Sequence, residues 1–194
     1  MIAGAPDPVA GSPGPPPSVY NIANALTLVR IALVPVFVWL LFQDGTGWRL
    51  AAFVVFAVAS ITDKIDGDLA RSRGLVTDFG KIADPIADKA LTGAALISLS
   101  IMGELWWWVT AAIMAREIGI TLMRFVVIRY GVIPASKGGK LKTMLQVIAI
   151  GLYILPGPLD PVRWTAMGAA LVVTVVTGLD YVAQAWRMRR KARS

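Results

Sequence analysis

Long apolar runs alternate with short polar segments along the chain. The runs cover residues 22–42, 50–70, 82–102, 106–129, 141–156 and 164–185. An α-helix rises about 1.5 Å per residue, so roughly 20 apolar residues cross the ~30 Å hydrocarbon core of a bilayer. The pattern predicts an all-α, polytopic membrane protein with six transmembrane helices. Because the fifth run is short, we expect Lys140 and Lys142 to extend their ammonium groups toward the aqueous surface.

Basic residues gather on alternate connections between these runs. They lie between runs two and three, between runs four and five, and after run six: Arg71, Arg73, Lys81, Arg129, Lys137, Lys140, Lys142, Arg187, Arg189, Arg190, Lys191 and Arg193. The opposite connections carry only Arg49 and Arg163, together with acidic residues and most of the tryptophans. The positive-inside rule therefore predicts that both termini are cytoplasmic, with an aromatic belt at the outer face.

Composition limits the chemistry that the chain can perform. The sequence is 56% hydrophobic and contains no Cys and no His, which argues against thiolate, zinc and imidazole chemistry and leaves oxygen ligands for any metal. The net charge of +7 is typical of an oriented membrane protein that meets anionic lipid, so no nucleic-acid partner is expected. We expect a disordered Pro-rich tail at 1–19, a six-helix catalytic domain at 20–186 and a basic tail at 187–194.

Four aspartates interrupt the apolar pattern on either side of the second connection. Asp63 and Asp66 are three residues apart, and Asp84 and Asp88 are four apart, so each pair shares one face of a helix. Carboxylates at this depth are costly unless they face a cavity or a cation. One or two divalent cations would balance the charge, and a two-metal site can polarise a phosphoryl group.

This spacing resembles the signature of the CDP-alcohol phosphatidyltransferases. The sequence reads Asp63-x2-Asp66-Gly67-x2-Ala70-Arg71-x8-Gly80-x3-Asp84-x3-Asp88 and matches every fixed position. The resemblance implies a membrane enzyme, usually a homodimer, that moves a phosphatidyl group from a CDP-linked lipid to an alcohol and releases CMP. It implies that the four aspartates hold two divalent cations, Mg²⁺ or Mn²⁺, and that Asp88 deprotonates the acceptor. It also implies CDP contacts for Gly67, Ala70, Arg71 and Thr77.

The first helix entry, residues 20–35, resembles the bacterial members that make phosphatidylglycerophosphate. It carries Asn24 and Thr27, which are three residues apart and so can face the nucleotide together; N-terminal helix capping is the alternative. The predicted reaction transfers a phosphatidyl group from CDP-diacylglycerol to glycerol 3-phosphate, on the cytoplasmic side of a bacterial inner membrane.

Residues 115–146 resemble the same members and supply cations for the acceptor's phosphate. We expect Arg116, Arg124, Lys137 and Lys140 to bind it, and Lys137 and Lys140 flank two glycines. A structural ion pair between Arg116 and Glu117 is the alternative, and positive-inside topology alone would also place lysines here.

Other acceptors and one other class of protein are alternatives. A cardiolipin synthase would take phosphatidylglycerol, and a phosphatidylinositol-phosphate synthase would take inositol phosphate. A divalent-cation channel would explain the aspartates. It would not explain Gly67, Ala70 and Arg71 at fixed offsets, and the outer halves of the second and third helices are nearly all apolar.

Overall fold

Helices make up almost all of the chain that the structure describes. The computed structural model describes residues 22–72, 77–127 and 137–191. Its helices are α1 (Ile22–Leu41), α2 (Thr46–Ser72), α3 (Asp78–Ile101), α4 (Trp107–Val127), α5 (Lys137–Ile154) and α6 (Asp160–Lys191). The predicted all-helical class and the six helices are therefore confirmed. Four helices begin four residues before their apolar runs, namely α2, α3, α5 and α6. Each of these helices includes polar residues in its first turn, ahead of the apolar run.

Three of the helices are long and apolar enough to cross a membrane by length and composition. The apolar stretches are Asn24–Leu41, Thr46–Asp63 and Asp160–Arg187, and α5 contributes the shorter stretch Leu141–Ile154. α3 and α4 carry charged residues within their apolar sequences, which lowers their hydropathy. The crossing of all six helices and the cytoplasmic location of both termini stay predictions.

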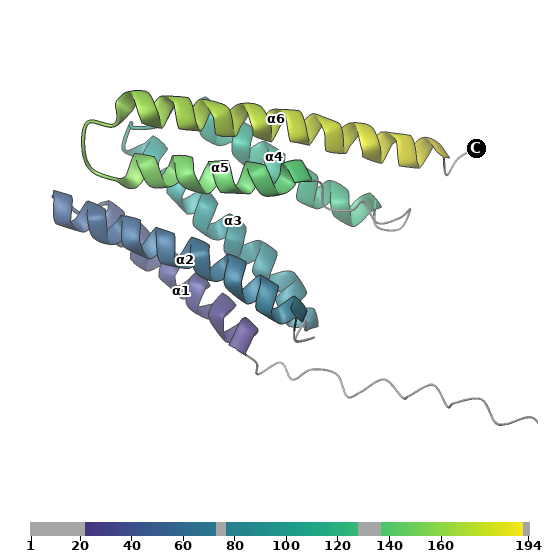
Figure 1. Cartoon of the computed structure of the whole chain (residues 1–194), viewed down its shortest axis with the longest axis horizontal. Coiled ribbons are helices and arrows are strands. Elements are labelled where there is room, and N and C mark those ends of the chain that lie inside the picture. The colour runs from purple at the N-terminus through teal and green to yellow at the C-terminus, as the bar shows by residue number, and fades with distance from the viewer. Residues whose placement is uncertain (1–21, 73–76, 128–136, 192–194) are drawn as a thin grey trace, which may run out of the picture.

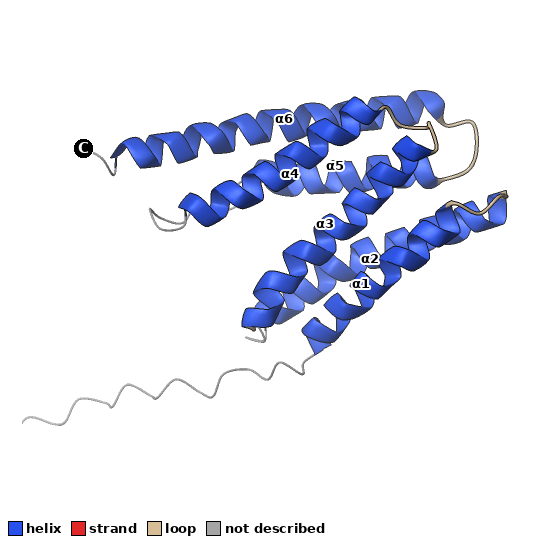
Figure 2. Cartoon of the chain, turned by 180° about the vertical axis from the view of Figure 1, so that it is seen from behind, coloured by secondary structure: helices blue, strands red, loops and turns tan. Residues whose placement is uncertain are grey.

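The helices form two groups that share α3. α1 packs against α2 and α3, while α6 packs against α4 and α5. α3 is inclined between the groups, and the groups lie closest at the end that holds loops 42–45, 102–106 and 155–159 (Figures 1 and 2). The largest buried apolar side chains lie in the helix halves nearest this end: Phe37, Leu41, Phe56, Leu96, Leu99, Ile113, Ile150 and Ile154. The core is thus at the predicted outer end.

Large apolar side chains are also exposed over the outside of the helices. Leu122 and Val172 are both 61% exposed, as expected for a surface that lipid covers. Exposed tryptophans surround the loops of the outer end: Trp48, Trp106, Trp107, Trp108 and Trp164. Their position agrees with the predicted aromatic belt.

Two arginines hold the C-terminal end of α5. Arg49 of α2 donates to the carbonyl oxygens of Tyr153 and Ile154 at 2.8 and 3.1 Å, and forms two 2.6 Å contacts with the Glu104 carboxylate. Arg163 of α6 donates to the carbonyl oxygens of residues 152 and 155. The last carbonyls of a helix lack partners within it and carry partial negative charge, so these cations stabilise the end of α5.

Candidate active site

The backbone places the four aspartates as two pairs on α2 and α3. α2 continues through Asp63 and Asp66 to Ser72, and α3 begins at Asp78, before Asp84 and Asp88. The side chains of Asp66 and Asp84 lie outside the described part of the structure, as do those of Ala70 and Arg71 and the surroundings of Gly67. Among the side chains that are described, no group of three or more candidate ligands comes together. The predicted four-aspartate cluster therefore stays a prediction.

Asp63 is held from the first helix. Arg30 of α1 is 1% exposed, and its guanidinium forms an ion pair with the carboxylate of Asp63, which is 36% exposed. A buried guanidinium needs such a partner, because an isolated charge in an apolar interior is very costly. This contact positions α1 beside the aspartates of α2. Arg30 and Asp63 are 33 positions apart, so no spacing within one helix indicates that they pair.

The predicted nucleotide contacts of α1 meet the start of α3. The side-chain nitrogen of Asn24 lies 2.9 Å from the hydroxyl oxygen of Thr77, and that hydroxyl lies 3.0 Å from the amide oxygen of Asn24. Both residues are 5% exposed, and Thr27, one turn further along α1, is 1% exposed. The structure thus brings together three residues that were predicted to contact CDP from separate parts of the sequence.

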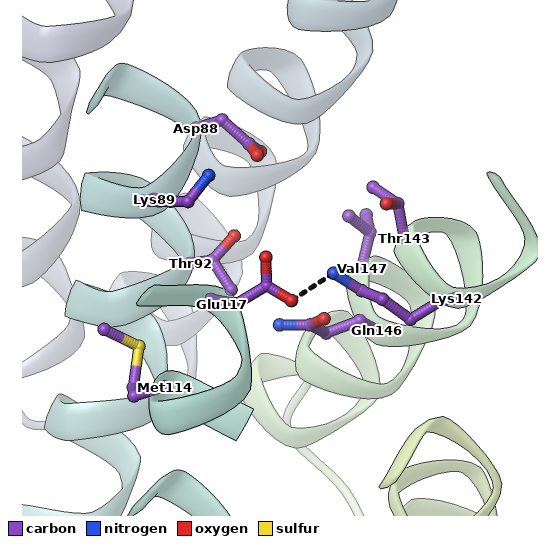
Figure 3. A pocket seen from close by; sticks show the side chains of 9 residues that line it. All are labelled: Asp88, Lys89, Thr92, Met114, Glu117, Lys142, Thr143, Gln146 and Val147. Carbon is purple, nitrogen blue, oxygen red and sulfur yellow. Dashed lines mark hydrogen bonds and ion pairs between the residues drawn. The ribbon is translucent and has the colours of Figure 1, made fainter. Parts of the chain in front are cut away.

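Asp88 lines a polar pocket between α3, α4 and α5 (Figure 3). The lining residues are Asp88, Lys89 and Thr92 of α3, Met114 and Glu117 of α4, and Lys142, Thr143, Gln146 and Val147 of α5. This pocket places the predicted general base next to several hydrogen-bonding groups.

An ion pair forms one wall of this pocket. The Lys142 ammonium pairs with the Glu117 carboxylate, and the two side chains are 7% and 12% exposed. The expectation that Lys142 reaches toward the aqueous surface was wrong. Because α5 begins at Lys137, Lys142 lies in its second turn, where the buried carboxylate of α4 offers a closer partner than water. The side chain of Lys140 lies outside the described residues.

Arg116 lies between α4 and α6. Its guanidinium is 3.2 Å from Glu117 Oε1 and donates to Thr177 Oγ1 at 3.2 Å. A Cβ atom on Gly178 would lie 3.1 Å from Arg116 Cγ, so the glycine makes room for the arginine. The structure therefore contains the ion pair given above as an alternative, and phosphate binding by Arg116 stays a prediction. The side chains of Arg124, Lys137 and Lys140 lie outside the described residues.

The donor atoms at this end of α2 and α3 suit a hard divalent cation. Asp63 and Asp88 supply carboxylate oxygens, and the chain has neither His nor Cys to supply softer ligands. Carboxylate oxygen is the ligand that Mg²⁺ and Mn²⁺ prefer. Asp66 and Asp84 are one helical turn from Asp63 and Asp88 on the same helices.

Gln146 is a pocket residue that the sequence-based assignment left out. The signal was present, because Gln146 stands between Leu145 and Val147 in an apolar run, four residues after Lys142. Residues four apart share a helix face, so both side chains reach the same pocket. The pattern did not indicate which helix would face them.

Comparison with known proteins agrees with this geometry. The family model of the CDP-alcohol phosphatidyltransferases matches residues 20–176, which include every helix that lines the pocket. The chain belongs to this family of membrane-associated transferases. Divalent cations are generally used in the family.

Three relatives illustrate where the chain lies within the family. A "Probable phosphatidylglycerophosphate synthase" of Mycobacterium tuberculosis (strain H37Rv) is 54% identical over 174 residues, which cover 87% of this chain and 83% of the relative. The "CDP-diacylglycerol--glycerol-3-phosphate 3-phosphatidyltransferase" of Bacillus subtilis (strain 168) is 36% identical, with 87% and 96% covered. The Escherichia coli (strain K12) protein with the same name is 34% identical, with 81% and 89% covered.

Proposed function

We propose that this protein transfers the phosphatidyl group of CDP-diacylglycerol to glycerol 3-phosphate, giving phosphatidylglycerophosphate and CMP. The observation that carries the proposal is the 54% identity, over 87% of the chain, to a relative named as a probable phosphatidylglycerophosphate synthase. The match extends over 174 residues of the two chains.

The aspartates supply the metal site and the base in this proposal. Asp63, Asp66, Asp84 and Asp88 hold two divalent cations, which when bound neutralise the pyrophosphate and polarise the bond to the leaving group. The carboxylate of Asp88 also accepts the proton of the acceptor's hydroxyl as its oxygen attacks phosphorus. Arg30 keeps the Asp63 carboxylate oriented toward the site.

Other residues of α1 to α3 hold the nucleotide. Asn24, Thr27, Gly67, Ala70, Arg71 and Thr77 contact the CDP moiety, which leaves as CMP. The hydrogen bonds between Asn24 and Thr77 support this assignment, because they fix the start of α3 against α1 before the nucleotide arrives. Preorganised polar groups bind a ligand at a smaller cost in entropy.

The acceptor's phosphate binds at the N-terminal end of α5. Its positive charge comes from Lys137, Lys140, Arg124 and Arg116. Helix N-termini attract anions through their free N–H groups and the helix dipole, and α5 begins at Lys137. The acceptor thus enters from the same side as the head group of the donor.

All six helices cross the membrane in this proposal, with both termini in the cytoplasm. The enzyme is a homodimer in the bacterial inner membrane, and its reaction takes place at the cytoplasmic face. The exposed apolar side chains on all sides of the bundle support burial in a bilayer. The acyl chains of the donor then stay in lipid while its head group reacts.

A single assay distinguishes the acceptors. Purified protein receives CDP-diacylglycerol and Mg²⁺ with glycerol 3-phosphate, inositol phosphate, serine or phosphatidylglycerol, and CMP release is measured. Glycerol 3-phosphate should give the highest kcat/KM, and removal of divalent cations with EDTA should abolish release until Mg²⁺ is returned. Equal rates with all four acceptors would contradict the proposal.

The role of Asp88 has its own test. Asp88→Asn should abolish turnover while CDP-diacylglycerol binding stays measurable, because the other carboxylates remain. Asp180→Asn is the matched control, since Asp180 is exposed on α6 and accepts a 2.8 Å hydrogen bond from the neighbouring Gln184. Near-normal turnover in Asp88→Asn would exclude Asp88 as the base.

A further inference from the structure

Gln146 is a buried amide that points into the Asp88 pocket (Figure 3). The residue is 3% exposed, and its side-chain oxygen has no hydrogen-bond partner among the described residues. Burying an amide without a partner is unfavourable, and an apolar side chain of the same length would avoid the cost. A ligand that completes the hydrogen bond in the working enzyme accounts for glutamine at this position.

The charges of the pocket indicate what kind of group binds there. Asp88 and Glu117 contribute two carboxylates, and Lys89 and Lys142 contribute two ammonium groups, so the charges balance. The Lys142 ammonium is already paired with Glu117. A phosphate dianion gains little electrostatic stabilisation in a pocket whose charges already balance. An uncharged hydroxyl carries no charge that the pocket must neutralise, and it can donate a hydrogen bond to the amide oxygen of Gln146.

The position of Gln146 along α5 gives the direction of the bound molecule. Gln146 is one turn further from the start of α5 than Lys142, and two and a half turns from Lys137. A polyol phosphate whose phosphate lies on the side of the pocket nearer the start of α5 therefore directs its uncharged end toward Gln146. Asp88 lies on the same pocket, across from α5.

We propose that Gln146 recognises the non-reacting hydroxyl of the acceptor and thereby selects polyol phosphates over simple alcohol phosphates. Its amide oxygen accepts a hydrogen bond from the middle hydroxyl of glycerol 3-phosphate, which directs the terminal hydroxyl toward Asp88. Gln146 is a specificity-determining residue in this scheme. The inference rests on the proposed function and adds a residue that recognises the middle hydroxyl of the acceptor.

Two acceptors that differ by one hydroxyl test this inference. 3-Hydroxypropyl phosphate keeps the terminal hydroxyl and the phosphate of glycerol 3-phosphate but lacks the middle hydroxyl. The unaltered enzyme should prefer glycerol 3-phosphate by between about 10-fold and 100-fold in kcat/KM, the range for one buried hydrogen bond. In Gln146→Met the ratio should fall to within about 2-fold of one, mainly through loss of activity with glycerol 3-phosphate.

Thermal unfolding separates this role from a structural one. Because Met removes a buried amide oxygen that lacks a partner among the described residues, Gln146→Met should unfold at the same or a higher temperature than the unaltered protein. Gln184→Met makes the same chemical change on α6, away from the pocket, and should keep the acceptor ratio. A variant at Gln146 that fails to fold, or that unfolds at a clearly lower temperature, would overturn the inference.

The kinetic outcomes distinguish this inference from the proposed function. An unaltered enzyme that uses both acceptors equally, or a Gln146→Met variant that keeps the original ratio, would overturn the role of Gln146 alone. An enzyme that makes no product from glycerol 3-phosphate would overturn the proposed function and this inference with it.

Discussion

Removal of the Lys142 ammonium should weaken the link between α4 and α5. The ion pair between Lys142 and Glu117 is buried, with exposures of 7% and 12%. Removing one partner of a buried ion pair costs about 3–5 kcal/mol, because the other charge stays buried without its counter-charge. Arg116, 3.2 Å from the same carboxylate, offsets part of this loss in Lys142→Met. We therefore expect a cost of about 3 kcal/mol for Lys142→Met.

Removal of the Glu117 carboxylate should lower the free energy of unfolding more than removal of the Lys142 ammonium. Glu117→Gln leaves the guanidinium of Arg116 and the ammonium of Lys142 close together without the carboxylate, so we expect a cost of about 5 kcal/mol. The double variant Glu117→Gln/Lys142→Met removes this repulsion and should be more stable than Glu117→Gln alone. Such non-additivity is expected for residues in direct contact.

Thermal unfolding in detergent measures these differences. For a chain of this size a cost of 3 kcal/mol corresponds to a decrease in Tm of roughly 6–12 °C. Arg187→Met, at an exposed position on α6, should shift the Tm by less than about 2 °C. The reasoning is refuted if Lys142→Met behaves like this control, or if the double variant shows the sum of the two single effects.

Two further predictions concern contacts between helices. Gly178→Ala should lower the free energy of unfolding by about 1–2 kcal/mol, because the new methyl group lies 3.1 Å from Arg116 Cγ. Gly168→Ala, with open space around it, should be neutral or stabilising by up to about 1 kcal/mol. Denaturant titration measures both variants, and a reversed order of stability would contradict this packing. Arg49→Met should lower the free energy of unfolding by about 2–3 kcal/mol, because it removes the contacts to the end of α5 as well as those to Glu104. Glu104→Gln keeps the contacts to α5 and should lower it by under about 1 kcal/mol. Equal losses in the same titration would mean that the carbonyl contacts add no stability.

The helices of this protein could be predicted from the sequence because apolar runs and short polar breaks alternate so regularly. The continuation of α2 and α3 through the aspartates was also predictable, since Asp63/Asp66 and Asp84/Asp88 keep helical spacing. The ends were less certain, because polar residues that extend a helix beyond its apolar run leave no mark in the hydrophobic pattern. α5, for example, begins at Lys137 instead of residue 141.

Contacts between distant residues could not be predicted in the same way. The pairing of Arg30 with Asp63 and that of Glu117 with Lys142 depend on which helix faces meet, and no periodicity within one helix contains that information. The error at Lys142 has this origin, because its depth was judged from the length of one helix alone. A buried carboxylate on a neighbouring helix changes the favourable direction of such a side chain.

The attachment of α5 at its C-terminal end has a consequence for the lipid environment. α5 has 18 residues and is about 27 Å long, shorter than a typical bilayer core, yet Arg49 and Arg163 fix it to its longer neighbours α2 and α6. In the proposed six-span arrangement, the depth of Lys142 and Gln146 in the bilayer is therefore set by the protein and not by hydrophobic matching. Turnover should accordingly vary little between vesicles of short-chain and long-chain lipids, and Arg49→Met should make it sensitive to bilayer thickness.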